Sequence, residues 1–287
     1  MKNHLSISIA TIIALSIPGM VKAQNLFEAD GGSGNIYVFT PSGVQSTFAS
    51  VLSPSGLAFN TAGDLFVTDT GNNTISEFTP GGLRSIFASG LDGPLGLAFN
   101  GAGNLFEADY ASGNIYEFTP GGIQSTFASG LSGPVGLTFD SAGNLFVGAQ
   151  LSGNIIEISP GGVQSVFASG LNPNGLAFNS GGNLFEADAS SGNIYEFTPG
   201  GARSTFASGL DNAEGLTFDS TGNLFVSAWN APASNSIYKI TPGGAMSLFA
   251  SGLNHPEFMA IQPVPEPSVW ATLGMGVLAL SGFRRRV

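Results

Sequence analysis

Three residues with oxygen-bearing side chains depart from an otherwise regular sequence. Asn174 and Glu214 directly precede the Gly-Leu pair of the runs PNGLAF and AEGLTF, and Glu257 directly precedes the related run FMAI. Carboxylate and amide oxygens are the ligands that hard cations such as Ca²⁺ and Mg²⁺ prefer in proteins. Asn174, Glu214 and Glu257 are therefore candidate ligands of a metal ion.

A tryptophan and a histidine lie close to these positions in the sequence. Trp229 is the only Trp outside the C-terminal segment, and His255 is the only His outside the N-terminal segment. Trp229 also begins a connection, residues 229–235, that adds three residues to the usual spacing. An exposed indole beside polar groups suits the face of a sugar or another flat ligand. We therefore predict a single ligand-binding sector, made of Asn174, Glu214, Trp229, His255 and Glu257.

Two kinds of function are compatible with such a sector. A bound cation can polarise a carbonyl group and activate water in a hydrolase, or it can hold a ligand without catalysis. The sequence has no Ser-His-Asp order, zinc-ligand spacing, phosphate-binding loop or strip of basic and aromatic residues. The leading hypothesis is therefore a binding protein that is not an enzyme, with a metal-dependent hydrolase as the alternative.

A repeat that fills most of the chain must position these residues. A block beginning Asn-Leu-Phe or Asp-Leu-Phe recurs at intervals of 39, 40, 40, 39 and 40 residues, with starts at Asn25, Asp64, Asn104, Asn144, Asn183 and Asn223. A fixed period near forty residues is typical of solenoids, propellers and arrays. The sequence therefore predicts six copies of one structural unit.

Each copy contains four short runs with the pattern of β-strands. In residues 104–136 they include NLFEAD, NIYEF and IQSTFAS, with Pro120-Gly121-Gly122 as a turn between the last two. Alternating side chains bounded by Gly, Asn, Ser and Pro are typical of strands. Six units of four antiparallel strands predict an all-β protein, a six-bladed β-propeller that covers residues 24–263.

The number of strands also predicts how the ring closes. The GLAFN run occurs five times, at Gly56, Gly96, Gly136, Gly175 and Gly215, and no copy precedes Asn25. The segment 258–262, FMAIQ, fits the missing sixth position. A C-terminal strand should therefore complete the first blade and leave no open sheet edge at the closure.

The blade pattern resembles that of NHL-repeat propellers and of the gluconolactonase-like and streptogramin-lyase-like groups. The residues that carry the resemblance are GLAF, LFVTD and GNNTI in the segment 56–75. The resemblance implies that GLAFN is the innermost strand, so the residue before it lies at the mouth of a central channel. In chain order these mouth positions are Ser55, Leu95, Val135, Asn174, Glu214 and Glu257.

The gluconolactonase-like pattern also implies a metal site at this mouth. In that family a divalent metal is held by a Glu, an Asp and Asn side chains. Asn174 matches the Asn that precedes an inner strand, Glu214 takes the Asp position, and Glu257 fits the role of the Glu. The match is incomplete, because Pro134-Val135 stands where a further Asn is expected.

Other acidic residues recur with the repeat, so we expect them to serve the fold. The aspartates at the end of the second strand should cap turns through nearby backbone amides, and they are Asp30, Asp69, Asp109 and Asp188. Glu28, Glu107 and Glu186 alternate with valines around the ring, and we expect them to be hydrogen-bonded groups packed between blades. We expect the third-strand glutamates to be solvated, namely Glu77, Glu117, Glu157 and Glu196.

Both ends of the chain have the features of export signals. Residues 1–23 have a basic start and an apolar stretch before Val21-Lys22-Ala23, so we predict a secretory signal peptide, with a buried N-terminal helix as the alternative. Residues 264–287 contain Pro265-Glu266-Pro267, an apolar run and then Arg284, Arg285 and Arg286. This order resembles the PEP-CTERM sorting signal of Gram-negative bacteria, which implies removal by an exosortase-type membrane peptidase and delivery to the cell surface or matrix. A permanent single-span anchor is the alternative.

The charge between these two ends restricts the partners. Residues 24–263 hold 18 of the 19 acidic residues and three of the eight basic residues, which gives a formal charge of −15. Such a surface repels nucleic acid and attracts cations or basic partners. The chain has no Cys, so packing alone must close the ring. We expect a monomer that binds an extracellular polysaccharide or another surface protein.

Overall fold

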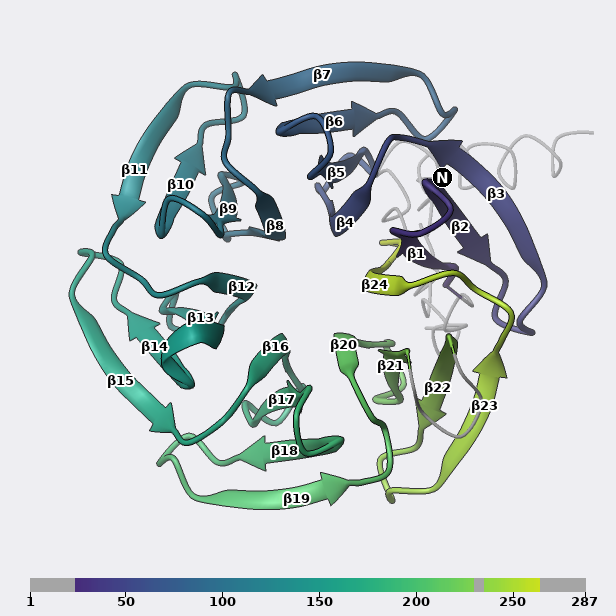
Figure 1. Ribbon diagram of the computed structural model, residues 1–287, viewed down its shortest axis with the longest axis vertical. Coiled ribbons are helices and arrows are strands. Elements are labelled where there is room, and N and C mark those ends of the chain that lie inside the picture. The colour runs from purple at the N-terminus through teal and green to yellow at the C-terminus, as the bar shows by residue number, and fades with distance from the viewer. Residues whose placement is uncertain (1–23, 230–234, 264–287) are drawn as a thin grey trace, which may run out of the picture.

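The computed structural model describes residues 24–229 and 235–263, and this part of the chain forms a ring of six four-stranded antiparallel sheets (Figure 1). The predicted all-β, six-bladed propeller is confirmed. The predicted signal peptide and sorting signal fall on residues 1–23 and 264–287, which lie outside the described residues. Within the described ranges, no helix has the length and apolar character needed to cross a membrane.

Each blade runs from an innermost strand beside the channel to an outermost strand at the rim. In that order, blade 1 consists of β24 (Pro256–Ile261), β1 (Leu26–Asp30), β2 (Asn35–Phe39) and β3 (Gln45–Ser50). Blade 2 consists of β4 (Pro54–Phe59), β5 (Leu65–Asp69), β6 (Thr74–Phe78) and β7 (Arg84–Ser89). Blade 3 consists of β8 (Pro94–Phe99), β9 (Leu105–Asp109), β10 (Asn114–Phe118) and β11 (Gln124–Ala128).

Blades 4 to 6 follow the same order. Blade 4 consists of β12 (Pro134–Phe139), β13 (Leu145–Ala149), β14 (Asn154–Ile158) and β15 (Gln164–Ser169), with a 3₁₀ turn, η1 (Gln150–Ser152), between β13 and β14. Blade 5 consists of β16 (Pro173–Phe178), β17 (Leu184–Asp188), β18 (Asn193–Phe197) and β19 (Arg203–Ala207). Blade 6 consists of β20 (Ala213–Phe218), β21 (Leu224–Ala228), β22 (Ser236–Ile240) and β23 (Met246–Ala250).

The ring closes between the two ends of the described chain, as the number of strands predicted. Strand β24 pairs antiparallel with β1, with Leu26 opposite Ile261 and Phe27 opposite Ala260. The backbone N–H of Gln262 also donates to the carbonyl of Asn25 at 2.9 Å. The last described strand therefore completes the first blade.

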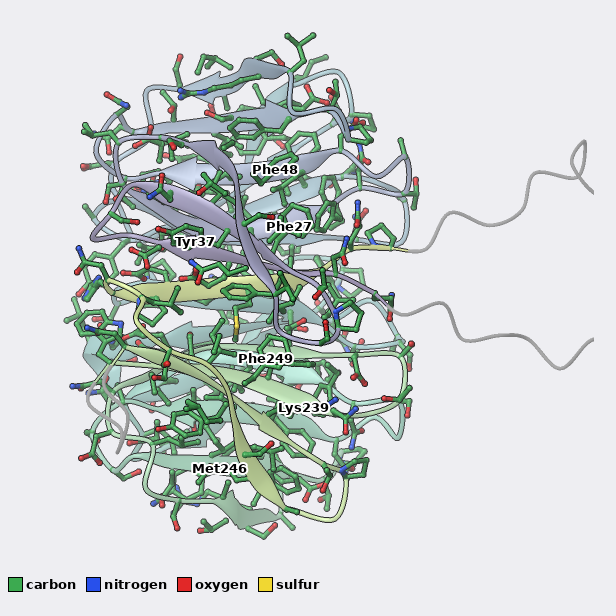
Figure 2. All side chains as sticks on the ribbon, turned by 90° about the vertical axis from the view of Figure 1, so that its right-hand side faces the viewer. Phe27, Tyr37, Phe48, Lys239, Met246 and Phe249 are labelled. Carbon is green, nitrogen blue, oxygen red and sulfur yellow. The ribbon has the colours of Figure 1, made fainter. Side chains whose placement is uncertain are left out.

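Phenylalanine rings fill the spaces between neighbouring blades. In the space between blades 2 and 3, the ring of Phe66 lies edge-on to Phe87 at 4.9 Å and to Phe99 at 5.2 Å between centroids. Equivalent trios fill four other spaces, and Figure 2 shows Phe27 beside Phe48 in the space between blades 1 and 2. Between blades 6 and 1, Phe225 and Phe249 pack with Ile261 instead. Edge-to-face contacts add to the stabilisation from burial alone, so each copy of the repeat seals one blade against the next.

The glycine of the innermost strand permits the close approach of adjacent blades. A Cβ on Gly175 would collide with the carbonyl oxygen of Glu214, and a Cβ on Gly215 would lie 2.6 Å from that of Glu257. The repeated Gly is therefore required by packing around the channel. The closing strand β24 differs from the other five, because it carries Phe258 at this position.

The ring has two faces with different roles. The innermost strands begin at one face, called the mouth face, which carries Asn174, Glu214 and Glu257, and they end at the opposite face, called the terminal face. Asn25 and Gln262 lie together on the terminal face, because they flank the paired ends of β1 and β24. Both ends of the described chain therefore leave from the face opposite the candidate site.

Candidate functional site

The structure brings the three predicted metal ligands to one sector of the mouth face. Asn174, Glu214 and Glu257 are each the second residue of an innermost strand, and these strands, β16, β20 and β24, lie on neighbouring blades (Figure 1). The corresponding residue of blade 2 is Ser55, while blades 3 and 4 carry Leu95 and Val135. One side of the mouth is therefore polar and the other is apolar.

Glu257 has two polar neighbours. Its Oε1 lies 3.0 Å from Nδ1 of His255, and its Oε2 accepts a long hydrogen bond of 3.5 Å from the Ser55 hydroxyl. The Glu257 side chain keeps 17% of its surface exposed, and that of His255 keeps 38%. The closing strand therefore presents a carboxylate that is oriented by two neighbours and remains open to solvent.

Trp229 and His255 form a pair beside this carboxylate. Their ring centroids lie 3.2 Å apart with planes inclined by 44°, and the indole N–H of Trp229 donates to the carbonyl of Pro256 at 3.1 Å. His255 has a φ of 70°, in the left-handed region that non-glycine residues rarely adopt. The predicted association of Trp229, His255 and Glu257 is present, and the indole is held in place by the closing strand. The rest of the predicted loop, residues 230–234, lies outside the described part of the chain.

Glu214 lies in an environment that disfavours its charged form. Burial raises the pKa of its carboxyl group well above the usual value, and the nearby Glu257 carboxylate raises this pKa further. The described residues offer no hydrogen bond to the Glu214 side chain. Glu214 is therefore the group in this sector that would gain most from a donor or a cation brought by a ligand.

Asn174 is buried, with 2% of its surface exposed, and both ends of its amide group are engaged. Its Oδ1 accepts a hydrogen bond of 2.5 Å from the Gln150 side chain, and its Nδ2 donates to the carbonyl of Ala213 at 3.5 Å. The sequence reasoning missed Gln150. The available signal was the change in blade 4, where Ala149-Gln150 replaces the Asp that ends the same strand in four other blades.

These contacts fit a preformed metal cage only in part. The oxygen types suit Ca²⁺ or Mg²⁺, but Asn174 Oδ1 is already bonded to Gln150 and Glu257 Oε1 faces His255. Within residues 24–229 and 235–263, no group of three or more His, Cys, Asp or Glu side chains is placed to hold a metal ion. A cation at this mouth would have to compete with the existing contacts of Asn174 and Glu257.

The aspartates that end the second strands cap turns, as predicted. Asp30 accepts hydrogen bonds from the backbone N–H of Ser33 at 2.9 Å and of Asn254 at 2.6 Å. Asp69, Asp109 and Asp188 accept equivalent backbone bonds in their own blades. For Asp188, burial alone would raise the pKa, but hydrogen bonds from Asn172, Ser191 and Ser190 hold it below its usual value. These four carboxylates serve the fold.

The prediction for Glu28, Glu107 and Glu186 was correct about packing and wrong about hydrogen bonding. All three are fully buried, and the carboxyl oxygens of Glu107 and Glu186 have no hydrogen-bond partner among the described residues. Glu28 accepts no hydrogen bond of ordinary geometry there either, although the backbone N–H of Glu257 lies close enough to lower its pKa. They share a strand face with Leu26, Leu105 and Leu184, which pack against the preceding blade. Burial and the neighbouring Asp188 raise the pKa of Glu186 to about 9, although Arg203 lowers it somewhat. These glutamates are best described as buried, protonated acids.

The third-strand glutamates fall into two groups, which the sequence did not separate. Glu117 and Glu196 each accept a hydrogen bond of 2.7 Å from an asparagine of their own blade, Asn104 and Asn183 respectively. Glu77 and Glu157 have no such partner among the described residues. All four remain partly exposed, as expected, and Glu117 and Glu196 additionally have an asparagine donor.

Comparisons with known proteins agree with this fold. The NHL repeat model matches residues 52–78. No curated protein sequence matches the chain. A chain from a nidogen/laminin complex superposes with a TM-score of 0.76 at 21% identity, over 85% of this chain and 100% of that chain.

Two similar solved structures are enzymes. Virginiamycin B lyase from Staphylococcus aureus has a TM-score of 0.60 at 19% identity and covers 71% of this chain and 73% of its own. A gluconolactonase from Xanthomonas campestris has a TM-score of 0.64 at 17% identity and covers 74% of this chain and 83% of its own. At these identities the similarity establishes the propeller fold and leaves the activity open.

Proposed function

We propose that this protein is an exported binding or scaffolding propeller of a Gram-negative bacterium that captures an extracellular polysaccharide or another surface protein at its mouth face. The observation that carries the proposal is the polar sector of Asn174, Glu214 and Glu257, flanked by the Trp229–His255 pair. An aromatic ring beside oriented polar groups suits sugar rings and protein side chains alike.

The positions of the two chain ends support the proposal that the polar sector of the mouth face is exposed to a partner. Asn25 and Gln262 lie on the terminal face, so any segment that continues from them leaves on the side away from the mouth. A propeller tethered at its C-terminal end, or delivered through a sorting tail, would thus present the mouth face outward. The structurally similar propeller of the nidogen/laminin complex belongs to a protein that binds a partner protein, which is consistent with a binding role.

The experiment compares the full chain with its Trp229→Ala variant for binding to extracellular polysaccharide purified from the producing cells. We expect the variant to bind at least roughly tenfold more weakly, because a central aromatic anchor contributes most to such sites. Leu83→Ser is the matched control, since Leu83 is 74% exposed on the outer rim, far from the mouth. Equal losses in both variants would contradict the proposal. Cell fractionation and the mass of the surface-exposed form test export and removal of the tail.

A metal-dependent hydrolase of the gluconolactonase type is the second candidate function. The observation in its favour is the electrostatic coupling of the Glu214 and Glu257 carboxyl groups, which a cation would relieve. The test is turnover of a panel of lactones with Ca²⁺ or Mg²⁺, by the wild type and by Glu214→Ala. Metal-dependent turnover that the variant loses would establish this function, and absence of turnover in the wild type would reject it.

A further inference from the structure

Grooves open on the terminal face between blades, and two of them combine aromatic rings with a carboxylate that has no asparagine or basic partner among the described residues. The groove between blades 2 and 3 has a volume of about 420 Å³, and the groove between blades 4 and 5 has a volume of about 670 Å³. Phe66, Phe87 and Phe99 line the first, with Glu77, and Phe146, Phe167 and Phe178 line the second, with Glu157. Neither groove belongs to the mouth site.

The carboxylate and the central ring of each groove face one another across a strand pair. Glu77 on β6 pairs with Phe66 on β5, and Glu157 on β14 pairs with Phe146 on β13. A positive charge in either groove would therefore lie beside both a phenyl ring and a carboxylate. Such surroundings attract alkylammonium and guanidinium groups more than neutral or anionic ones.

These two carboxylates lack the asparagine donor that holds Glu117 and Glu196. In blade 3, Asn104 donates to Glu117, but in blade 4 the equivalent Asn144 donates to Asp140 at 2.9 Å instead of to Glu157. In blade 2 the equivalent residue is Asp64, which accepts from Asn60 and has no amide to offer Glu77. The only hydrogen bond to the Glu77 side chain among the described residues is a long one, 3.4 Å, from the Ser85 hydroxyl.

The protein itself places a cation at the same position of a third groove. In the groove between blades 6 and 1, of about 260 Å³, Lys239 stands where Glu77 and Glu157 stand, opposite Phe225. Its ammonium group lies 5.6 Å from the centre of the Phe225 ring. Figure 2 shows Lys239 and Phe249, which both line this groove. The Lys239 groove thus already contains the cation that the other two grooves lack.

We propose that the grooves at Glu77 and Glu157 are binding sites for the basic side chains of a polypeptide partner. The carboxylate would pair with the ammonium or guanidinium group, and the phenyl rings would pack against the aliphatic part of the side chain. Two observations favour a polypeptide as the carrier of the basic group. Residues 24–263 have a formal charge of −15, which attracts basic chains. Residues at the edge of the first groove, such as Gly101 and Ala102, are exposed and can be reached by an extended chain. This site is separate from the mouth face and does not depend on its function.

The test measures fluorescence anisotropy of a labelled peptide of alternating glycine and arginine with the full-length protein at fixed ionic strength. Its citrulline counterpart, which has the same shape without the charge, serves as the peptide control. The double variant Glu77→Gln/Glu157→Gln should bind the arginine peptide more weakly, by roughly fivefold for each groove. The double variant Glu117→Gln/Glu196→Gln removes the same charge from equivalent positions, where asparagines already hold the carboxylates, and should keep its affinity within about twofold.

Further variants separate the groove from general electrostatics. Lys239→Glu should strengthen binding, because it converts the third groove into a copy of the other two. Phe146→Leu should weaken binding while leaving the charge unchanged. Equal losses in the two double variants, or equal binding of the citrulline peptide, would overturn the proposal. Thermal unfolding of every variant shows that the folded state is intact.

Discussion

At the scale of residues, the same side-chain type serves different purposes according to its partners. Asp109 is fully buried and accepts two backbone hydrogen bonds, whereas Glu107, two residues earlier on the same strand, is equally buried and accepts none within the described structure. Glu257 differs again, because it faces a histidine and solvent. Acidic residues in this chain therefore divide into caps, buried acids and candidate ligand groups.

Asp30 should contribute strongly to stability because it links the closing segment to the first blade. We expect Asp30→Ala to lower the free energy of unfolding by about 2 kcal/mol, since the N–H groups of Ser33 and Asn254 lose their acceptor. Urea unfolding followed by circular dichroism measures this loss. Asp92→Ala is the control, because the Asp92 side chain is exposed. Equal effects of the two substitutions would show that the cap is unimportant.

The sequence predicted the roles of individual residues correctly where the local backbone sets the role. Asx-type caps follow from the aspartate and the turn that comes after it, so the roles of Asp30 and Asp188 were predictable. The contact between Gln150 and Asn174 joins residues 24 positions apart, and that between Trp229 and Pro256 joins residues 27 apart. Contacts of this kind depend on how blades meet, and no local pattern encodes them.

At the scale of elements, the blades alternate in a way that affects stability. Blades 1, 3 and 5 carry a buried Glu on the second strand, and blades 2, 4 and 6 carry Val67, Val147 and Val226 at the same position. The spaces between blades 6 and 1, 2 and 3, and 4 and 5 therefore each contain an acid without a hydrogen-bond partner among the described residues. Since burial disfavours the charged form of each glutamate, the packing between these blades should become less stable when the glutamate ionises.

The pH dependence of stability tests this point. The pKa of Glu186 rises from 4.5 to about 9 on folding, so the folded state holds this proton more tightly than the unfolded state does. The resulting stability is fully present below about pH 4.5 and is lost as pH rises toward 9. Glu186→Gln cannot ionise, so we expect its stability relative to the wild type to increase by several kcal/mol between pH 5 and pH 9.

The measurement is urea unfolding of the wild type and of Glu186→Gln at several pH values between these limits. Glu196→Gln, which changes a partly exposed carboxylate of the same blade, is the control. A pH-independent difference between Glu186→Gln and the wild type would mean that Glu186 is ionised in the folded protein. The triple substitution of Glu28, Glu107 and Glu186 by Gln should enlarge the effect.

The strands themselves were predictable because each has a period of two and is bounded by turn residues. Each copy of the repeat carries the residues that set the strand register, the turns and the phenylalanines between blades. The structure of one blade therefore predicts that of the others. The 3₁₀ turn η1 was not predicted, because it follows Ala149, where the capping Asp of four other blades is missing and the repeat offers no template for the turn. The sequence showed which residues depart from the repeat. It did not show how their side chains are arranged, because that arrangement depends on tertiary contacts.

At the scale of the whole molecule, closure by β24 makes the ring and also builds the candidate site. The segment from His255 to Ile261 supplies the strand that pairs with Leu26–Asp30, and it also supplies Glu257 and the carbonyl that holds Trp229. Folding of the ring and formation of the mouth sector are therefore coupled. The propeller closes with hydrogen bonds and packing, without a disulfide.

Truncation tests this coupling. A chain that ends at His255 lacks β24, so blade 1 exposes the inner edge of β1 and the ring stays open. We expect it to lose cooperative thermal unfolding in calorimetry and to aggregate on gel filtration. A chain that ends at Pro263 keeps β24 and should unfold like the full chain. Cooperative, unchanged unfolding of the shorter chain would show that the sixth innermost strand is dispensable.

Binding of the partner at the mouth face can be measured by hydroxyl-radical footprinting. The full chain is labelled with and without the extracellular polysaccharide of the producing cells, and the modified residues are identified by mass spectrometry. We expect protection of Trp229, His255 and Phe258, with unchanged labelling of the exposed rim residues Leu83, Ile123 and Val163. Protection confined to the rim, with Trp229 and His255 labelled as in the free protein, would contradict this expectation.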